Sequence, residues 1–93
     1  MNTITSTYDL TTIHDSRKSF YGKAKVRNTI TPDGELRIEL LSYGTTVAAI
    51  IDGVPTIYDF YSATTTRHTK EFLLQHGHEA TTKAQMLRDY VRN

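Results

Sequence analysis

The feature that most constrains the fold is an alternation of residue types between Phe20 and Ile30. Apolar or small side chains occupy most even positions there, and polar or charged side chains occupy the odd positions. This period of two is typical of a β-strand with one buried face and one solvated face. The segment 31–34, Thr-Pro-Asp-Gly, predicts a hairpin turn, because proline presets the turn entry and glycine takes the left-handed position.

Three further strands are expected after this turn. Residues 35–43 alternate again, and residues 45–51 are rich in alanine and β-branched residues, as is typical of a central strand. Gly44 between them suits a tight turn or a β-bulge. Asp52-Gly53 favours a type I′ turn, so residues 54–61 are expected to form a fourth strand.

The periodicity changes at Ser62, a good N-cap residue, and predicts a helix over residues 63–76 that ends at Gly77. A second helix is expected to begin at Thr82, because Thr82 and Gln85 have the spacing of a capping box. The apolar stripe expected for this helix consists of Ala84, Leu87, Tyr90 and Val91.

In the first helix, Phe72 and Leu73 are expected to face the sheet, and Arg67 and Glu71 to pair on the exposed side. The order of elements predicts an α+β fold, a four-stranded antiparallel β-meander followed by two helices packed on one sheet face. The length of 93 residues predicts a single domain over residues 1–93. Its N-terminal segment, residues 1–16, is expected to be irregular or to form a short helix.

The composition excludes several classes of protein. The chain has no cysteine, which rules out disulfides and thiolate metal sites. No apolar run approaches the roughly 20 residues that span a bilayer, and the first residues lack the basic start and apolar core of a secretory signal. We therefore expect a cytoplasmic protein without membrane contact. The net charge of +1 does not by itself indicate nucleic-acid binding.

No catalytic or metal-binding motif stands out. His14-Asp15-Ser16 are sequence neighbours, which rarely meet as a hydrolytic triad and more often form a polar turn. His76 and His78 straddle a predicted helix end without two further zinc ligands clearly placed. Asp59, on the fourth expected strand, and His68 are the best remaining pair for an enzyme. We expect no enzymatic activity, no cofactor and no metal.

Two groups of residues are candidates for binding. The first is a basic strand face, on which cations project from one side of the first two expected strands: Lys23, Lys25, Arg27 and Arg37. Such a face can lie on a phosphate backbone, or it can be a solvated surface with cross-strand ion pairs through Glu39.

The second group lies at the start of the first helix and comprises Thr64, Thr65, Arg67, His68 and Lys70. Four threonines give this helix a poor intrinsic propensity, which raises the suspicion of a functional reason. Free N–H groups, hydroxyls and cations suit an anion or a nucleic-acid groove. Alternatively, the threonines extend the cap and pack on the sheet, with His68 hydrogen-bonded inside the core.

Two motifs resemble those of a known family. Residues 42–48 contain an S-Y-x-T-x-V-A element, and residues 61–73 contain a Y-S-x-T-T-x-x-H-x-x-E-F-L element. Together they resemble a family of small uncharacterised proteins from phages, plasmids and their bacterial hosts. The resemblance implies a mobile-element context, in which small proteins often block host defence enzymes, CRISPR nucleases included, by stoichiometric binding.

The expected function is therefore non-enzymatic. The first hypothesis is a phage or plasmid accessory protein, cytoplasmic in a bacterial host, that binds nucleic acid or a nucleoprotein complex of host defence, as an anti-CRISPR inhibitor does. The alternative is a protein–protein or homo-oligomeric interaction module that makes no contact with nucleic acid.

Overall fold

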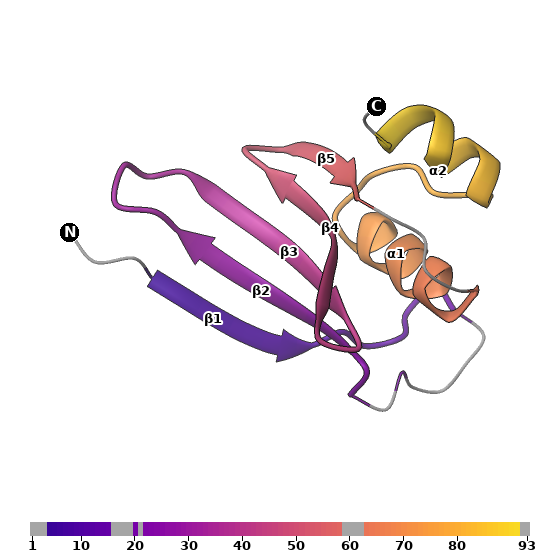
Figure 1. The fold of residues 1–93 in the computed structure, drawn as a ribbon, viewed down its shortest axis with the longest axis horizontal. Coiled ribbons are helices and arrows are strands. Elements are labelled where there is room, and N and C mark those ends of the chain that lie inside the picture. The colour runs from indigo at the N-terminus through magenta and orange to yellow at the C-terminus, as the bar shows by residue number, and fades with distance from the viewer. Residues whose placement is uncertain (1–3, 16–19, 21, 59–62, 92–93) are drawn as a thin grey trace.

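The computed structural model describes residues 4–15, 20, 22–58 and 63–91. Its strands are β1 (Ile4–Asp9), β2 (Ala24–Ile30), β3 (Leu36–Ser42), β4 (Thr45–Ile51) and β5 (Val54–Ile57), and its helices are α1 (Ala63–Gln75) and α2 (Lys83–Tyr90). The strands form one antiparallel sheet in the order β1-β2-β3-β4-β5, and both helices contact it (Figure 1). The α+β meander predicted from the sequence is confirmed, with five strands instead of four.

The additional strand is β1, in the N-terminal segment that was expected to be irregular or a short helix. It pairs with β2 along its whole length, from Ile4 opposite Ile30 to Asp9 opposite Lys25. Residues 5–9 are all exposed, so neither face of this strand is covered by the core. The even positions carry Ile4, Ser6 and Tyr8, and the odd positions carry Thr5, Thr7 and Asp9. This period-two signal is short and interrupted by serine, which is why it did not predict a strand.

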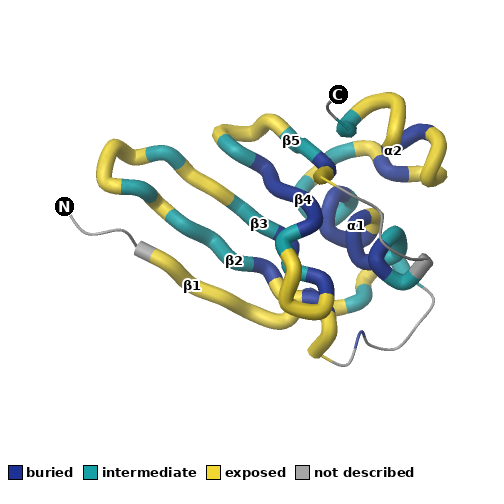
Figure 2. Tube along the Cα trace, in the orientation of Figure 1, coloured by how far each residue is buried: buried dark blue, intermediate teal, exposed yellow. Residues whose placement is uncertain are grey.

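The core lies between α1 and the sheet face that carries the even-numbered residues of β2 and β3. Val26, Leu40 and Ala48 are opposite one another on neighbouring strands, and all three are fully buried (Figure 2). Phe72 and Leu73 of α1 are also fully buried, as the sequence predicted. The alternation in β2 thus marks the face that the helix covers.

A register shift between β3 and β4 increases the number of core residues. Leu40 pairs with Ala48 and Leu41 pairs with Thr46, which leaves Val47 as an extra residue on β4. Val47 and Ala48 are both fully buried, although neighbouring strand residues normally point to opposite faces. The irregularity expected near Gly44 is therefore a bulge inside β4, next to the hairpin turn.

The turn between β4 and β5 has the backbone that its sequence predicts. Asp52 and Gly53 both have positive φ, 50° and 82°, as a type I′ hairpin requires. The last strand ends at Ile57 and is shorter than the expected 54–61. Asp59 and Ser62, the predicted partly buried acid and the predicted N-cap, lie outside the described residues.

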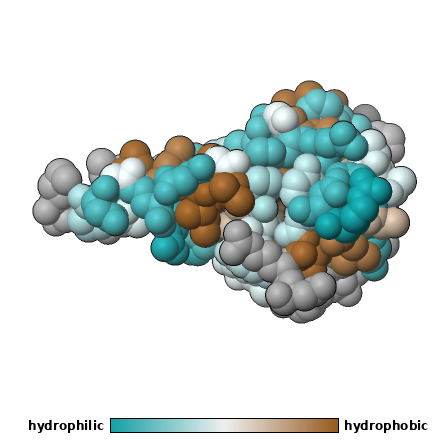
Figure 3. All heavy atoms as spheres, turned by 90° about the horizontal axis from the view of Figure 1, so that it is seen from above, coloured by the Kyte–Doolittle hydropathy of each residue, from teal (hydrophilic) through white to brown (hydrophobic). Residues whose placement is uncertain are grey.

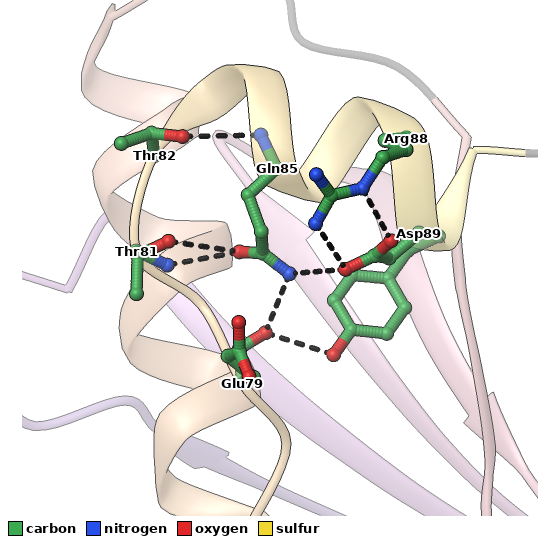
Figure 4. A network of polar contacts seen from close by, with 7 residues as sticks. Glu79, Thr81, Thr82, Gln85, Arg88 and Asp89 are labelled. Carbon is green, nitrogen blue, oxygen red and sulfur yellow. Dashed lines mark hydrogen bonds and ion pairs between the residues drawn. The ribbon is translucent and has the colours of Figure 1, made fainter.

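The helix ends follow the sequence signals. Gly77, with φ of 79°, follows α1 and takes the left-handed position that stops a helix. Thr82 caps α2, since its hydroxyl accepts a hydrogen bond from the backbone N–H of Gln85 at 3.1 Å. In a capping box the Gln85 side chain would accept from the backbone N–H of the cap residue, Thr82. Here it accepts instead from the backbone N–H of Thr81, at 2.9 Å (Figure 4).

The predicted apolar stripe of α2 is wrong in its central part. Ala84 and Leu87 are exposed, whereas Gln85 and Met86 are buried. Gln85 is buried because its amide also donates to the carbonyl of Glu79 and to the carboxylate of Asp89, at 3.3 and 2.8 Å (Figure 4). Polar contacts with the preceding loop thus set the rotation of this short helix.

The helices cover only one end of the sheet. Figure 1 shows α1 and α2 beside the end where β4 enters and β5 leaves, while the turn between β2 and β3 extends well beyond them. In the view from above, this part is a narrow arm attached to a thicker body (Figure 3). Both faces of the sheet are therefore without a covering helix in the arm.

Candidate functional site

A buried glutamate joins α1 to the segment that follows β1. The side chain of Glu71 is only 1% exposed. Its Oε1 atom accepts hydrogen bonds from three consecutive backbone N–H groups, those of Ile13, His14 and Asp15, at 2.8, 2.7 and 2.9 Å. Its Oε2 atom contacts Nδ1 of His14 at 2.7 Å and accepts from the Gln75 amide at 3.0 Å. The carboxylate thus has five polar partners.

These partners explain how a carboxylate is accommodated inside the protein. Burial acts to raise the pKa of Glu71, but hydrogen bonds from His14, from Gln75 and from the backbone of residues 14 and 15 lower it by more, so the pKa lies below its ordinary value. Glu71 is therefore a buried anion in a cage of donors, and it fixes the backbone of residues 13–15 against α1.

Arg67 takes a partner other than the one predicted from the sequence. The expected pair with Glu71 is not formed; Arg67 instead donates to both carboxylate oxygens of Asp15, from Nε at 3.1 Å and from Nη2 at 2.7 Å. The reason is tertiary, because Glu71 holds Asp15 beside the first turns of α1. A contact 52 residues apart in sequence therefore replaces the local pair.

Together these residues form the walls of an open pocket. Its volume is about 410 Å³, and it is lined by His14, Asp15, Arg67, Lys70, Glu71 and Leu74. The residues from α1 are spaced three and four apart, so they form one stripe of the helix. Lys70 is exposed, and among the described residues no acid lies within ion-pair distance of it. The pocket thus includes Arg67 and Lys70 from the predicted binding set, whereas the sequence analysis missed Glu71 and interpreted His14 as part of a polar turn.

A second polar cluster lies between α1 and the sheet, inside the core. The hydroxyl of Ser42 on β3 contacts Oγ1 of Thr65 at 3.1 Å and Nδ1 of His68 at 2.9 Å. Thr65 and His68 are both buried, and the His68 ring meets Phe20 edge-on with centroids 4.5 Å apart. Burial lowers the pKa of His68, and Asp15 acts weakly in the opposite direction. The structure therefore places these two predicted binding residues in the interior, where the neutral form of the imidazole is favoured.

The remaining residues at the start of the helix are placed differently. Thr64 is partly buried, and Lys70 is exposed at the pocket. Thr69 is fully buried and donates its hydroxyl to the Thr65 carbonyl at 2.9 Å, within the helix itself. Among the described residues, no buried side-chain nitrogen or oxygen is without a hydrogen-bond partner. The threonines of α1 are thus used mainly in packing and internal hydrogen bonds.

The basic strand face is largely neutralised by acids in the sheet and in the turn before β3. Lys25 pairs with Asp9 of β1, Arg27 pairs with Glu39 across β2 and β3, and Arg37 pairs with Glu35, at 2.6, 3.2 and 2.6 Å. The cross-strand pair through Glu39 is the one that the sequence analysis anticipated. These cations remain accessible to water, but each already has a partner.

Lys23 is the exception on this face. Its ammonium lies over the Tyr43 ring, 5.7 Å from the centroid, and both residues are exposed. Tyr43 has a positive φ of 53° in the turn between β3 and β4. The turn therefore presents one cation stacked on one aromatic ring.

The arm of the sheet carries an uncovered apolar surface. Ile30 of β2 and Leu36 of β3 are direct partners in the register, on the same sheet face as the buried core, and they are 42% and 41% exposed. Tyr8 of β1 lies on this face as well, opposite Val26, and is 44% exposed. The face that α1 covers at one end of the sheet is thus open to solvent at the other end.

The described residues contain neither a membrane-spanning helix nor a cluster of metal ligands. In this part of the chain, no helix has the length and apolar character needed to cross a membrane. In the same residues, no three side chains of the metal-binding types gather into a site that could hold an ion.

The fold and the site define a small α+β domain, a five-stranded meander whose first helix is anchored by a caged glutamate. Residues 8–88 match the model of a family described as a family of unknown function (DUF8033), and the chain therefore belongs to this family. No match was found among curated proteins or among solved structures.

Proposed function

We propose that this protein is a non-enzymatic binding protein that engages a protein partner through the open edge of β1 and the apolar arm surface beside it. The observation that carries this proposal is the position of β1 at the edge of the sheet, exposed along residues 5–9. Exposed edge strands pair readily with another chain unless they are blocked by proline, lysine or a bulge.

The edge of β1 has none of these blocks. Its sequence, Ile-Thr-Ser-Thr-Tyr-Asp, contains no proline and no lysine, and its pairing with β2 has no register shift. The N–H of Leu10 donates to the carbonyl of Ala24 on the β2 side at 2.9 Å. Because backbone groups alternate in direction along a strand, the N–H and C=O groups of Thr5, Thr7 and Asp9 point away from β2. They are placed to accept a strand from another protein.

The apolar arm surface gives the same edge a means of selectivity. Main-chain hydrogen bonds supply affinity when a strand is added to a sheet, and side-chain contacts on the sheet face supply specificity. Tyr8 lies on β1 itself, and Ile30 and Leu36 lie one and two strands further in, all on the core-facing side of the sheet. A partner strand that pairs with β1 is expected to pack its own apolar residues against this surface.

The resemblance to phage and plasmid proteins supports a particular class of partner. We propose that the partner is a nucleoprotein complex of host defence, and that the protein acts as a stoichiometric inhibitor of the anti-CRISPR type in the cytoplasm of a bacterial host. The ion pairs on the strand face favour contact with a protein subunit of that complex over contact with its nucleic acid, because Lys25, Arg27 and Arg37 already have acidic partners.

The test is affinity purification from a bacterial host with two matched variants at one position. Thr7→Pro removes an N–H group that points outward, and Thr7→Ala removes the side chain but keeps that group. We expect nuclease-resistant capture of one partner by the wild type and Thr7→Ala, and its loss with Thr7→Pro. Circular dichroism verifies that both variants are folded. Equal capture by both variants would contradict strand addition at β1.

The homo-oligomeric form of the proposal has its own measurement. If the partner is a second copy of the chain, sedimentation of the purified protein gives a dimer mass for the wild type and a monomer mass for Thr7→Pro. A monomeric mass at all concentrations removes this form and leaves a different protein as the partner.

Direct contact with nucleic acid is the second candidate function, and the stacked pair of Lys23 and Tyr43 is the observation that favours it. A cation and an exposed ring suit a single strand, whose bases stack on aromatic side chains. Binding to a single-stranded oligonucleotide should weaken steeply as salt rises, and more so in the wild type than in Lys23→Gln. A salt-independent signal would exclude this candidate.

A further inference from the structure

We propose that the open pocket between α1 and residues 13–15 binds a phosphate monoester. This inference is independent of the proposed function, because it concerns the helix-covered end of the molecule and not the edge of β1. It rests on which atoms of the lining residues are already engaged and which lining residues are exposed to solvent.

The acidic oxygens of the pocket are occupied from within. Both oxygens of Glu71 accept hydrogen bonds from the backbone of residues 13–15, His14 and Gln75. Both oxygens of Asp15 receive donors from Arg67, and the Asp15 side chain is only 10% exposed. An anion that enters the pocket therefore meets carboxylates whose charge is already compensated.

Two polar residues of the lining are exposed, Lys70 and His14. Lys70 is exposed, and no described acid lies within ion-pair distance of it. The imidazole of His14 is 44% exposed and is held through Nδ1 by Glu71, which leaves the other ring nitrogen directed away from the carboxylate. These groups place an ammonium on the α1 wall of the pocket and an imidazole nitrogen on the wall formed by residues 13–15.

The volume and the apolar wall of the pocket indicate a ligand larger than a free inorganic ion. A pocket of about 410 Å³ falls within the roughly 300–1,000 Å³ of small-molecule sites, and Leu74 adds an apolar side chain to its lining. A phosphate monoester offers three terminal oxygens in different directions to donors on two walls, whereas a carboxylate offers two oxygens in one plane. An organic group attached to the phosphate would pack against Leu74.

The pocket is also organised before any ligand arrives. Its two walls are joined by contacts between residues 52 to 58 apart in sequence, all of which converge on Glu71 or Arg67. Binding at a preformed site avoids the cost of ordering loops and side chains. The same ligand chemistry occurs in a free nucleotide and at the terminal phosphate of a nucleic-acid strand, and the experiment distinguishes these two sources.

The experiment is a titration of the full chain followed by amide chemical shifts and by calorimetry. The probes are adenosine monophosphate, adenosine, succinate, and a short oligonucleotide with and without a 5′-phosphate. We expect adenosine monophosphate to shift amides around His14, Lys70 and Leu74, and adenosine to leave them unchanged. Tighter binding of the phosphorylated oligonucleotide than of the free nucleotide would identify a strand end as the source.

The matched variants are Lys70→Gln in the pocket and Lys25→Gln on the strand face, each of which removes one exposed ammonium. Loss of a charge-assisted hydrogen bond should weaken binding about tenfold or more in Lys70→Gln, and Lys25→Gln should bind as the wild type does. Amide spectra verify that both variants are folded. No shift with any phosphorylated probe at millimolar concentration, equal binding of succinate, or an unchanged affinity in Lys70→Gln would each overturn the proposal. Thr7→Pro should bind the monoester normally, so failure of the β1 proposal is distinguishable from failure of this one.

Discussion

Replacement of Glu71 by glutamine tests whether the caged carboxylate anchors α1 to the N-terminal segment. The substitution Glu71→Gln keeps the size and shape of the side chain and replaces one oxygen by an NH2 group. If the remaining oxygen keeps the three backbone N–H groups of residues 13–15, the NH2 group faces Nδ1 of His14 and the Gln75 amide. The Gln75 amide is itself a donor, and His14 must change its tautomer to accept.

The expected loss follows from these contacts. A buried donor left without an acceptor costs about 1–3 kcal/mol, and a hydrogen bond to a charged group contributes about 1.5–3 kcal/mol, more than a neutral one. Losing one or two of the contacts with His14 and Gln75, and weakening the three backbone hydrogen bonds, should lower the free energy of unfolding by about 3 kcal/mol. A domain of this length has a free energy of unfolding of roughly 5–14 kcal/mol, so the variant should fold but be clearly destabilised.

Urea denaturation followed by far-ultraviolet circular dichroism measures this loss, since the chain has no tryptophan. With a slope of about 1.5 kcal/mol/M, the midpoint should fall by roughly 2 M. Glu35→Gln is the matched control, because it makes the same chemical change at a carboxylate paired on the surface with Arg37, where the expected loss is below about 1 kcal/mol.

The pH dependence provides a second, independent readout. The pKa of Glu71 is lower in the folded protein than its ordinary value of 4.5, so the unfolded chain takes up the proton first as the pH falls. The contribution of Glu71 is therefore complete well above pH 4.5 and is lost as the pH falls through the lowered folded-state pKa. The difference in free energy of unfolding between the wild type and Glu71→Gln should be largest at pH 7 and should shrink on acidification. Equal midpoints at pH 7, or a gap that does not change with pH, would refute the anchoring role.

Two further predictions concern other parts of the fold. His68→Ala should lower the free energy of unfolding by about 2–4 kcal/mol, because it removes a buried ring and its contact with Ser42. Burial lowers the pKa of His68 below 6.5, so the wild type should lose stability as the pH falls from 6.5 toward the lowered pKa of the folded protein. The His68→Ala variant should lose less stability over this pH range. If the mutation leaves the urea midpoint unchanged, His68 has a surface role and not a structural one. Gly53→Ala should lower the free energy of unfolding by about 1 kcal/mol, because alanine is strained at a φ of 82°. Steric clash adds nothing, since no atom lies within 4 Å of the added Cβ. Gly53→Asn should lower the stability less, as measured by thermal unfolding.

Most of the fold was predictable because it depends on local patterns. The alternation in β2 and the Asp52-Gly53 turn are short-range signals, and the structure confirms them. The strand β1 was harder to predict from the same pattern, because its alternation is short and Ser6 interrupts the apolar positions Ile4 and Tyr8. Only the pairing with β2, more than a dozen residues away, determines that this segment is a strand.

The candidate site was less predictable, because the partners of its central residue are distant in sequence. Glu71 follows Arg67 by four residues, which is the spacing of an ordinary surface pair, and only the return of residues 13–15 to α1 decides otherwise. One signal was nevertheless present in the sequence. His68 and Phe72 define the buried side of the helix, and Glu71, three residues after His68 and next to Phe72, lies on the border of that side.

The two polar clusters around α1 also explain why a helix rich in threonine occurs here. Thr65 contacts Ser42 on the sheet, and Thr69 donates to the Thr65 carbonyl, so these side chains are used inside the protein. Glu71 fixes the same helix to residues 13–15. The weak helix propensity is thus compensated by tertiary hydrogen bonds and packing, and it needs no partner molecule as its reason. A search for partners therefore has better grounds at the edge of β1 and at Lys70, where the described surface leaves backbone groups and a cation open to solvent.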